Sequence, residues 1–410
     1  MSSQSQRASR VLTISFYFVG WLFAYAIRYA LSIVAPTLMT AYHIPPKEMG
    51  YILSAWTWSY TGGVLLMGPL VDRFGAWIVT AVGSVVWSVS TLALPLAQNP
   101  SSLFVLRLLF GLGHSVLIAA TAVSVSQEFS GKERARAIAS VYSGNQVGLA
   151  AGAIVAAFIL VNAGWMAVFY WIGGASALFV AAWLFLYPDK RIGTLTNRSG
   201  TPRTARRWLS FFRNRSTWGI AFGQMGYLYA LGVFVSWLPG YFVLERKMTL
   251  LKSGIVSALP FWVGIITTLA GGWLADHLVE KGVSPALTRK SIIGIGMTAA
   301  TAFVSIAAFV PQAWLAVTLL TLCVGSLRIT TGSVNALPID LASPSEVGTL
   351  SSIQNFFGNI GAVSAPIVTG YLVNMSGSFT LALVVAGAMT TLGAGAYVLI
   401  LRHSVVMGRS

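Results

Sequence analysis

Apolar stretches of about 20 residues recur from one end of the chain to the other, and each is long enough to cross a bilayer as a helix. Short connections such as "AQNPSS" and "VPQA" separate neighbouring stretches. The pattern predicts an all-α membrane protein with twelve transmembrane helices, at residues 11–36, 49–70, 77–97, 102–127, 135–161, 166–187, 216–242, 252–274, 289–310, 313–337, 348–372 and 378–401.

One long polar and basic segment, residues 188–215, divides the chain into two halves of six predicted helices, 1–187 and 216–410. The halves resemble each other, since the second predicted helix of each ends in Gly-x-x-x-Asp, at Gly68–Asp72 and at Gly272–Asp276. Two similar halves around a central site are typical of transporters. We expect the glycines to let helices approach closely and Asp72, Arg73 and Asp276 to act at a gate. A simple solvated helix end is the alternative.

Composition and charge set the class of protein and its orientation. Of the 410 residues 56% are hydrophobic and 9% charged, with a mean hydropathy of +0.75, which indicates an integral membrane protein. The first apolar stretch is longer than the roughly 7–15 residues of a signal-peptide core, so we expect it to remain as a helix. The net charge of +16 could suggest nucleic acid, but the basic residues gather on one predicted side, and only Lys47, Arg246, Lys247 and Lys252 fall on the other. The positive-inside rule then predicts that both termini are cytoplasmic, in a multi-pass protein of the cell (inner) membrane with no nucleic-acid partner.

Three arginines, Arg28, Arg107 and Arg328, lie inside predicted helices. A charge at the centre of a membrane helix costs roughly 2.5–3.5 kcal/mol on insertion scales. No carboxylate is placed to neutralise them, because all ten acidic residues fall in loops or near predicted helix ends: Glu48, Asp72, Glu128, Glu133, Asp189, Glu245, Asp276, Glu280, Asp340 and Glu346. We infer that the missing partner is an anionic ligand.

Several sequence strings resemble the major facilitator superfamily. They are "GPLVDRFG" after the second predicted helix, "GGWLADHLVEKG" at the corresponding place in the second half, and "RLLFGLGHS" in the fourth helix. Within that superfamily the chain is similar to the anion:cation symporter group of sugar-acid and organic-anion transporters, through "MGYILSAWTWSYT", "GKERARAIASVYSGNQVGLA", "SWLPGYF" and "KGVSPALTRKS". The resemblance implies two pseudo-symmetric six-helix bundles and secondary transport.

The resemblance also implies site residues. Arg28 matches the arginine of helix 1 that binds the substrate carboxylate, and Arg107 matches the arginine of helix 4. Polar substrate contacts are implied at Asn145, Gln224, Asn335 and Asn355. Two departures affect coupling: Ile27 replaces a frequent aspartate before the helix 1 arginine, and His114 replaces a frequent glutamate two turns after the helix 4 arginine.

Helix faces add to this set. Trp21, Tyr25, Arg28 and Ser32 lie near one stripe of helix 1, which suits a carboxylate with an apolar or hydroxylated body. Arginine presents a planar fork to a carboxylate, although Arg28 could instead snorkel or cap a neighbouring helix. Arg328 shares a face with Gly325, Thr331 and Asn335, so Arg28 and Arg328 could together hold a dicarboxylate; pairing of Arg328 with helix carbonyls is the alternative.

Energy coupling is open at this stage. Arg107 suits a role near the outer gate as well as direct contact. His114 can exchange a proton under physiological conditions, or it can be a structural histidine.

We therefore expect a monomeric secondary transporter of a small organic anion, working by alternating access, with proton symport as the first hypothesis. Exchange or uniport of dicarboxylates without a proton, and an anion sensor on the same scaffold, are the alternatives. No catalytic set, P-loop, metal-ligand spacing or cofactor motif is evident, so we do not expect an enzyme.

Overall fold

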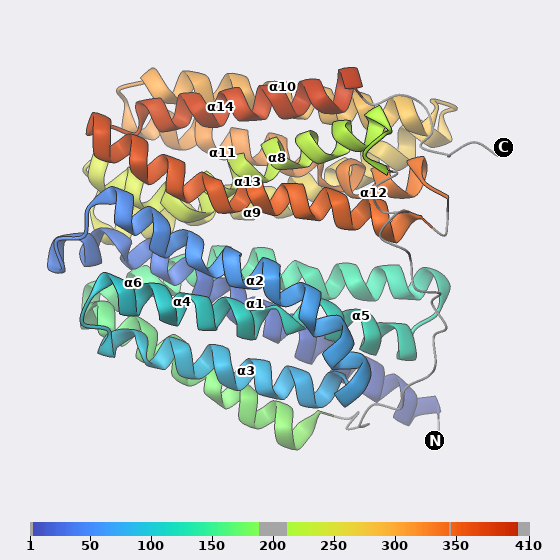
Figure 1. Ribbon diagram of the computed structural model, residues 1–410, viewed down its shortest axis with the longest axis horizontal. Helices are drawn as coiled ribbons and strands as arrows, with labels where there is room; N and C mark the ends of the chain where they lie inside the picture. Colours follow the sequence, from blue (N-terminus) through green and yellow to red (C-terminus); the bar gives the residue numbers. More distant parts are fainter. Residues whose placement is uncertain (1–2, 188–210, 344–345, 401–410) are drawn as a thin grey trace. The chain divides into compact units, whose positions relative to one another are not determined.

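The computed structural model describes residues 3–187, 211–343 and 346–400, and those residues form helices joined by short turns (Figure 1). The helices are α1 (Ser3–Ala41), α2 (Pro46–Phe74), α3 (Ala76–Leu92), α4 (Pro100–His114), α5 (Val116–Glu128), α6 (Gly131–Leu186), α8 (Arg215–Gly240), α9 (Leu250–Glu280), α10 (Pro285–Phe309), α11 (Ala313–Ile329), α12 (Thr331–Leu341), α13 (Val347–Ser376) and α14 (Thr380–Gly395). Three short helical turns, η1 (Leu94–Leu96), η2 (Tyr241–Glu245) and η3 (Ala396–Ile400), extend α3, α8 and α14.

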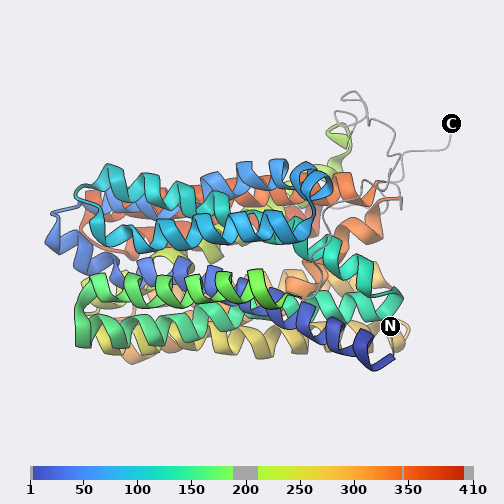
Figure 2. The same cartoon turned by 90° about the horizontal axis from the view of Figure 1, so that it is seen from below.

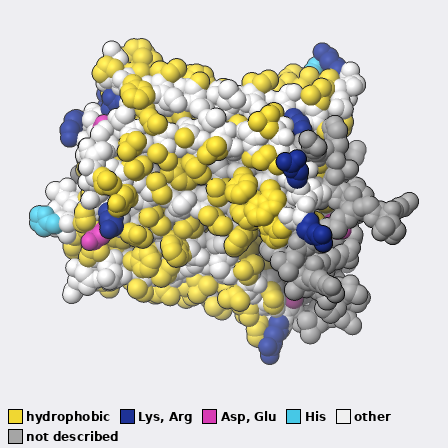
Figure 3. Space-filling view, turned by 45° about the horizontal axis from the view of Figure 1, so that its top comes forward, with side chains coloured by type: hydrophobic (Ala, Val, Ile, Leu, Met, Phe, Trp, Pro, Cys, Tyr) yellow, Lys and Arg dark blue, Asp and Glu magenta, His cyan; other side chains and the backbone are white. Residues whose placement is uncertain are grey.

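Ten helical stretches within the described ranges are long and apolar enough to cross a membrane. One of them, Arg136–Leu186, is two helices joined at Gly164, whose φ of 83° breaks the helical path, and its two arms run antiparallel (Figure 2). The 29-residue helix α2 is a further long helix. The twelve predicted helices fit this arrangement, with most boundaries displaced by only a few residues. On the face in Figure 3, hydrophobic side chains cover the middle, and Lys and Arg lie towards its ends.

Local signals set several helix starts. The Asn99 side chain accepts from the backbone N–H of Ser102, and Pro100 occupies the first turn of α4, where its missing N–H costs nothing. Ser284 caps α10 in the same way, by accepting from the N–H of Leu287. These polar residues stand between long apolar runs, which is why the sequence pattern located the ends well.

The chain groups into two compact units. Unit 1 comprises Met1–Arg198 and Pro239–Ala258, and unit 2 comprises Ser199–Leu238 and Leu259–Ser410. The division predicted from the sequence at the 188–215 linker differs at residues 239–258: it assigns them to the second half, whereas they group with unit 1. Within unit 1, the Tyr29 hydroxyl donates to the carbonyl of Ser257 (3.4 Å). Residues 188–210 of the predicted linker lie outside the described residues.

Unit 1 is organised around α1, which packs closely against α6. A Cβ built on Gly144 would lie 2.4 Å from the carbonyl oxygen of Phe18, and one on Gly148 would lie 2.4 Å from that of Leu22. Because only glycine permits this approach, the two backbones lie in contact along this face.

A row of hydrogen bonds holds the other side of α1 to α5. The Thr13 hydroxyl donates to Glu128 (2.9 Å), and the hydroxyls of Tyr17 and Ser124 share a hydrogen bond of 2.9 Å. The α1 helix is therefore fixed on two sides, which sets the positions of the side chains further along it.

The fourth predicted helix of each half, Pro100–Glu128 and Ala313–Leu341, is one helical stretch with a local distortion at a single residue, which the sequence pattern did not predict. The distortion between α4 and α5 falls at Ser115, whose hydroxyl donates to the carbonyl of Leu112, three residues earlier (2.7 Å). The distortion between α11 and α12 falls at Thr330, whose hydroxyl donates in the same way to Leu327 (2.7 Å). A hydroxyl that bonds back to its own helix bends it. The first of these positions directly follows His114, and the second lies two residues after Arg328.

Candidate functional site

Tyr25 and Arg28 project from one stripe of α1, as predicted. The guanidinium carbon of Arg28 lies 5.4 Å from the centre of the Tyr25 ring and 3.9 Å from that of Trp56 on α2. A cation over an indole face is attracted by the ring quadrupole. The Trp21 and Tyr25 rings lie 5.9 Å apart, so the predicted aromatic stripe is present. The structure adds Trp56 to it.

Arg107 is brought next to Arg28, which the sequence analysis did not predict. Its side chain is 1% exposed, and its Nη2 donates to the backbone carbonyl of Arg28 (3.5 Å). Its guanidinium also lies over the ring of Phe110, at 4.8 Å. Neither Nε nor Nη1 has a hydrogen-bond partner among the described residues. Arg107 is therefore a buried cation with donors to spare beside the principal candidate residue.

His114 lies at the end of α4 and is fully buried. Its Nδ1 accepts a hydrogen bond from the indole N–H of Trp56 (3.0 Å), whereas its Nε2 has no partner among the described residues. Because an indole nitrogen can only donate, this bond requires an unprotonated Nδ1 and places the proton of a neutral ring on Nε2.

Aromatic rings from α1, α2, α3 and α4 surround the imidazole of His114. Their centres lie between 5.1 and 6.4 Å from the centre of the imidazole, and they belong to Trp21, Tyr25, Trp56, Tyr60, Trp87 and Phe110. The position of the ring is therefore fixed by packing as well as by its hydrogen bond.

Asn145 reaches the same region from α6. The glycine contacts between α6 and α1 place Tyr142 against Trp21, with ring centres 5.1 Å apart. Three residues further along, the side-chain oxygen of Asn145 is buried without a hydrogen-bond partner in the described part of the chain. This unused acceptor is compatible with the predicted contact to a hydroxyl of a ligand.

The predicted residues of unit 2 differ in their surroundings. Arg328 is half-buried and its Nε has no partner among the described residues, so it can bind an anion. Gln224 is 5% exposed, and its carbonyl accepts from the hydroxyl of Tyr397 (2.9 Å). Asn335 and Asn355 are exposed, and the amide of Asn355 donates to a carbonyl of its own helix, that of Ser351 (2.9 Å).

The predicted polar stripe of Gly325, Arg328, Thr331 and Asn335 crosses the distortion at Thr330. The predicted continuous helix is present as one helical stretch, Ala313–Leu341, with a local distortion at Thr330, where α11 ends at Ile329 and α12 starts at Thr331. The hydroxyl of Thr331 shares a hydrogen bond with that of Tyr227 (2.9 Å).

The candidate gate residues Asp72, Arg73 and Asp276 are exposed at the ends of α2 and α9. The predicted reason for the glycines before the two aspartates is wrong in this structure. A Cβ on Gly68 or Gly272 would meet no atom of the described residues within 4 Å. It is the neighbouring Gly271 that permits close packing, with a Cβ position 2.0 Å from the carbonyl oxygen of Ile329.

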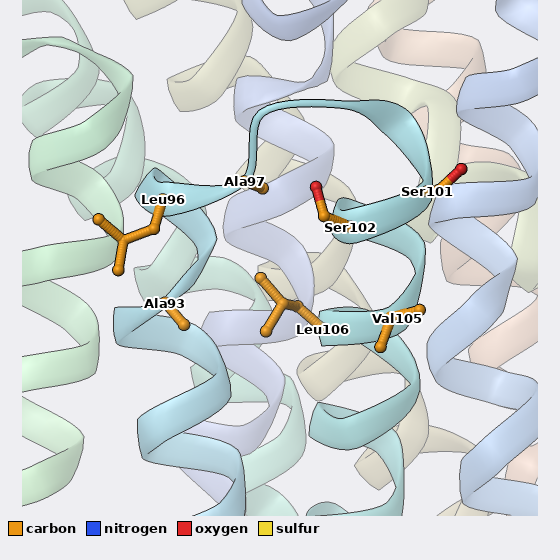
Figure 4. A pocket seen from close by; sticks show the side chains of 7 residues that line it. All are labelled: Ala93, Leu96, Ala97, Ser101, Ser102, Val105 and Leu106. Carbon is orange, nitrogen blue, oxygen red and sulfur yellow. The ribbon is translucent and has the colours of Figure 1, made fainter.

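A surface pocket of about 460 Å³ lies elsewhere in unit 1, between the end of α3 and the start of α4 (Figure 4). It is lined by Ala93, Leu96, Ala97, Ser101, Ser102, Val105 and Leu106. None of these side chains carries a charge.

The sequence model of the Major Facilitator Superfamily matches residues 17–366. This chain belongs to the major facilitator superfamily. A probable L-galactonate transporter of Escherichia coli is 28% identical over 416 residues, covering 98% of this chain and 92% of the relative. A probable galactarate/D-glucarate transporter of Bacillus subtilis is 28% identical over 434 residues, covering 98% and 93%. Among solved structures, an inward-facing bacterial homologue of the human lysosomal transporter Spinster superimposes with a TM-score of 0.81 at 15% identity, covering 96% and 97%. This facilitator is therefore a multi-pass membrane transporter and not an enzyme, and it is similar to transporters of sugar acids.

The sequence analysis missed two residues of this cluster as site members. Trp56 and Tyr60 are one helical turn apart on α2 and their rings stack, with centres 4.9 Å apart. Their spacing is visible in the sequence, but tryptophan and tyrosine usually pack or lie at membrane interfaces, so spacing alone did not distinguish them.

Proposed function

We propose that this facilitator moves a small organic anion across the membrane by alternating access, and that Arg28 binds the carboxylate of the substrate. The observation that carries the proposal is Arg107, a buried cation with two unsatisfied nitrogens beside Arg28. Taking a cation out of water costs several kcal/mol unless a partner compensates it. A bound carboxylate would accept charge-assisted hydrogen bonds from this region.

The body of the substrate would meet aromatic and amide groups. Tyr25 and the free side-chain oxygen of Asn145 suit a hydroxylated anion such as a sugar acid. Gln224, Asn335 and Asn355 remain proposed contacts from the second half, and Gln224 would need to exchange its bond with Tyr397 to reach a ligand.

A dicarboxylate is our proposal for the finer substrate class. Arg328 offers a second cation with an unsatisfied nitrogen, and galactarate and glucarate, which the name of one relative mentions, carry a carboxylate at each end.

For energy coupling we propose proton symport through His114, with Arg107 near the outer gate and Asp72, Arg73 and Asp276 at the inner gate. Exchange of one dianion for another is the alternative, since Ile27 and His114 stand where the resemblance to the symporter group implies acidic coupling residues. We place the protein in the bacterial inner membrane, as a monomer with both termini in the cytoplasm.

Proteoliposomes loaded with unlabelled sugar acid provide the test. Counterflow of labelled galactonate or glucarate must occur, and Arg28→Gln must abolish it. An inward proton gradient drives accumulation if the mechanism is symport. Acceleration by internal substrate alone, with no response to the gradient, would favour exchange. Thermal stabilisation by the same acids without any flux would instead identify a sensor.

A further inference from the structure

Trp56 connects two residues that do not share a helix. Its ring lies beneath the guanidinium of Arg28 (3.9 Å), and its indole N–H donates to Nδ1 of His114 (3.0 Å). The Tyr60 ring stacks on it at an interplanar angle of 19°. Trp56 is 3% exposed, so its ring is packed on all sides. The Arg28 guanidinium therefore rests on an indole that cannot turn freely, and beside the Tyr25 ring.

The hydrogen bond to His114 selects one orientation of that indole. Stacking alone leaves the plane of a ring free to rotate about its normal, whereas a single N–H donor aimed at a fixed acceptor does not. The acceptor is fixed because His114 is fully buried among rings and ends α4, directly before the distortion at Ser115.

We propose that His114 is a positioning residue that acts through Trp56 to hold the guanidinium of Arg28 in the orientation that binds the anion. This inference rests on the proposed function, and it deepens that function by giving His114 a task that needs no proton transfer. Two contacts make up this connection. The Trp56 indole N–H donates to Nδ1 of His114, and the face of the Trp56 ring lies against the guanidinium of Arg28.

The same bond would transmit a change of protonation. The titratable and charged groups that face the imidazole are Arg28 and Tyr25 on α1, Tyr60 on α2 and Arg107 on its own helix. A proton bound at Nδ1 would occupy the lone pair that accepts the hydrogen bond from Trp56. The indole would then lose this hydrogen bond, and the guanidinium of Arg28 would no longer be held in one orientation. Protonation would then weaken anion binding through one hydrogen bond, which is the sign that favours release of the anion rather than its joint binding with a proton.

The test compares two substitutions of His114 by anion affinity. Glutamine offers a carbonyl acceptor to the indole but does not titrate, whereas leucine offers none. We expect His114→Gln to keep the Kd for galactonate or glucarate within about twofold, and His114→Leu to weaken it roughly tenfold, equivalent to about 1.4 kcal/mol. Trp56→Phe keeps a ring under Arg28 without the N–H, and should weaken binding similarly.

The double variant decides whether the two residues act as one unit. If they do, His114→Leu with Trp56→Phe is no weaker than either single change, because contacting residues are non-additive. Additive losses, or equal affinities for His114→Gln and His114→Leu, would overturn the proposal. Thermal melting without anion checks folding. His277→Leu, at a histidine of α9 stacked on Trp273 (5.2 Å), is the control substitution of the same type.

Positioning and transport are read by different assays. The Kd from thermal shift or calorimetry in detergent reports the positioning of Arg28, whereas proton-driven accumulation in proteoliposomes reports coupling. His114→Gln separates them: normal affinity with gradient-driven uptake retained shows positioning alone, and normal affinity with that uptake lost shows that His114 both positions and carries the proton. Weak binding by His114→Gln would contradict the positioning role, whatever the flux.

Discussion

The Nη2 atom of Arg107 donates to the backbone carbonyl of Arg28, at 3.5 Å, so the second guanidinium of unit 1 is tied to the helix that carries the first. This bond uses one of the five N–H donors of Arg107, and Nε and Nη1 find no partner among the described residues. An unpaired buried cation lowers the stability of the protein, so we infer that Arg107 serves its function. The consequences can be measured as stability and as affinity.

Arg107→Met should stabilise the protein without anion and weaken its response to anion. Removing a buried, poorly compensated charge in favour of an apolar side chain of similar length can stabilise by about 1–4 kcal/mol. Thermal melting in detergent, with and without a saturating sugar acid, measures both effects. Arg107→Lys keeps the charge and should show no gain. A lower melting temperature for Arg107→Met in the absence of anion would contradict this account.

Arg28→Lys should bind the anion weakly even though it keeps the charge. A hydrogen bond to a charged group contributes about 1.5–3 kcal/mol, and lysine can copy neither the planar fork nor its stacking on Trp56. We expect Arg28→Lys and Arg28→Gln to raise the Kd at least tenfold in titration calorimetry. Native affinity in Arg28→Lys would show that a point charge is sufficient there.

Arg328→Gln should discriminate between substrates by their number of carboxylates. If Arg328 binds a second carboxylate, the substitution should weaken the binding of glucarate by roughly tenfold or more, since one lost hydrogen bond to a charged group costs about 1.5–3 kcal/mol. The affinity for galactonate should remain nearly unchanged. Competition for labelled substrate by each acid gives the two ratios. Equal losses for both acids would remove the case for a dicarboxylate.

Gly148→Ala should destabilise unit 1, whereas Gly62→Ala should not. The added methyl at Gly148 would lie 2.4 Å from the Leu22 carbonyl, and at Gly62 it would meet no atom of the described residues within 4 Å. Overpacking costs about 1–3 kcal/mol, while alanine in an open helical position gains up to about 1 kcal/mol over glycine. Thermal melting of the purified variants should therefore shift in opposite directions. If Gly148→Ala melts at the same temperature as the unchanged protein, α1 and α6 can separate slightly without a loss of stability.

The pattern of hydrophobic positions was sufficient to locate the helices, because in a bilayer every spanning segment must be long, apolar and internally hydrogen-bonded. Predicted boundaries such as 102–127 and 378–401 agree closely with the structure, and the predicted gap between residues 161 and 166 contains Gly164. The stripe of Trp21, Tyr25 and Arg28 was also correct, since it depends only on helical periodicity. The similarity to sugar-acid transporters followed from short motifs whose residues are adjacent in the sequence.

The local distortions at Ser115 and Thr330 could not be predicted, because a serine or threonine in an apolar run is normally an ordinary helical residue. Whether its hydroxyl bonds back to the helix depends on neighbouring packing. The explanation given for Gly68 and Gly272 failed for a related reason: the motif does not say which helix lies opposite, and in the structure Gly271 makes the close contact.

The sequence by itself determined that this is a helical membrane protein, that three cations lie within its spans, and that its acidic residues lie at helix ends. Those conclusions depend on local composition and periodicity. Only the tertiary structure brought Arg28, Trp56, Arg107 and His114 together, from three helices separated by as many as 86 positions along the chain. Burial against neighbouring helices decides which groups a cation or an imidazole meets, and that depends on packing between helices rather than on spacing within one.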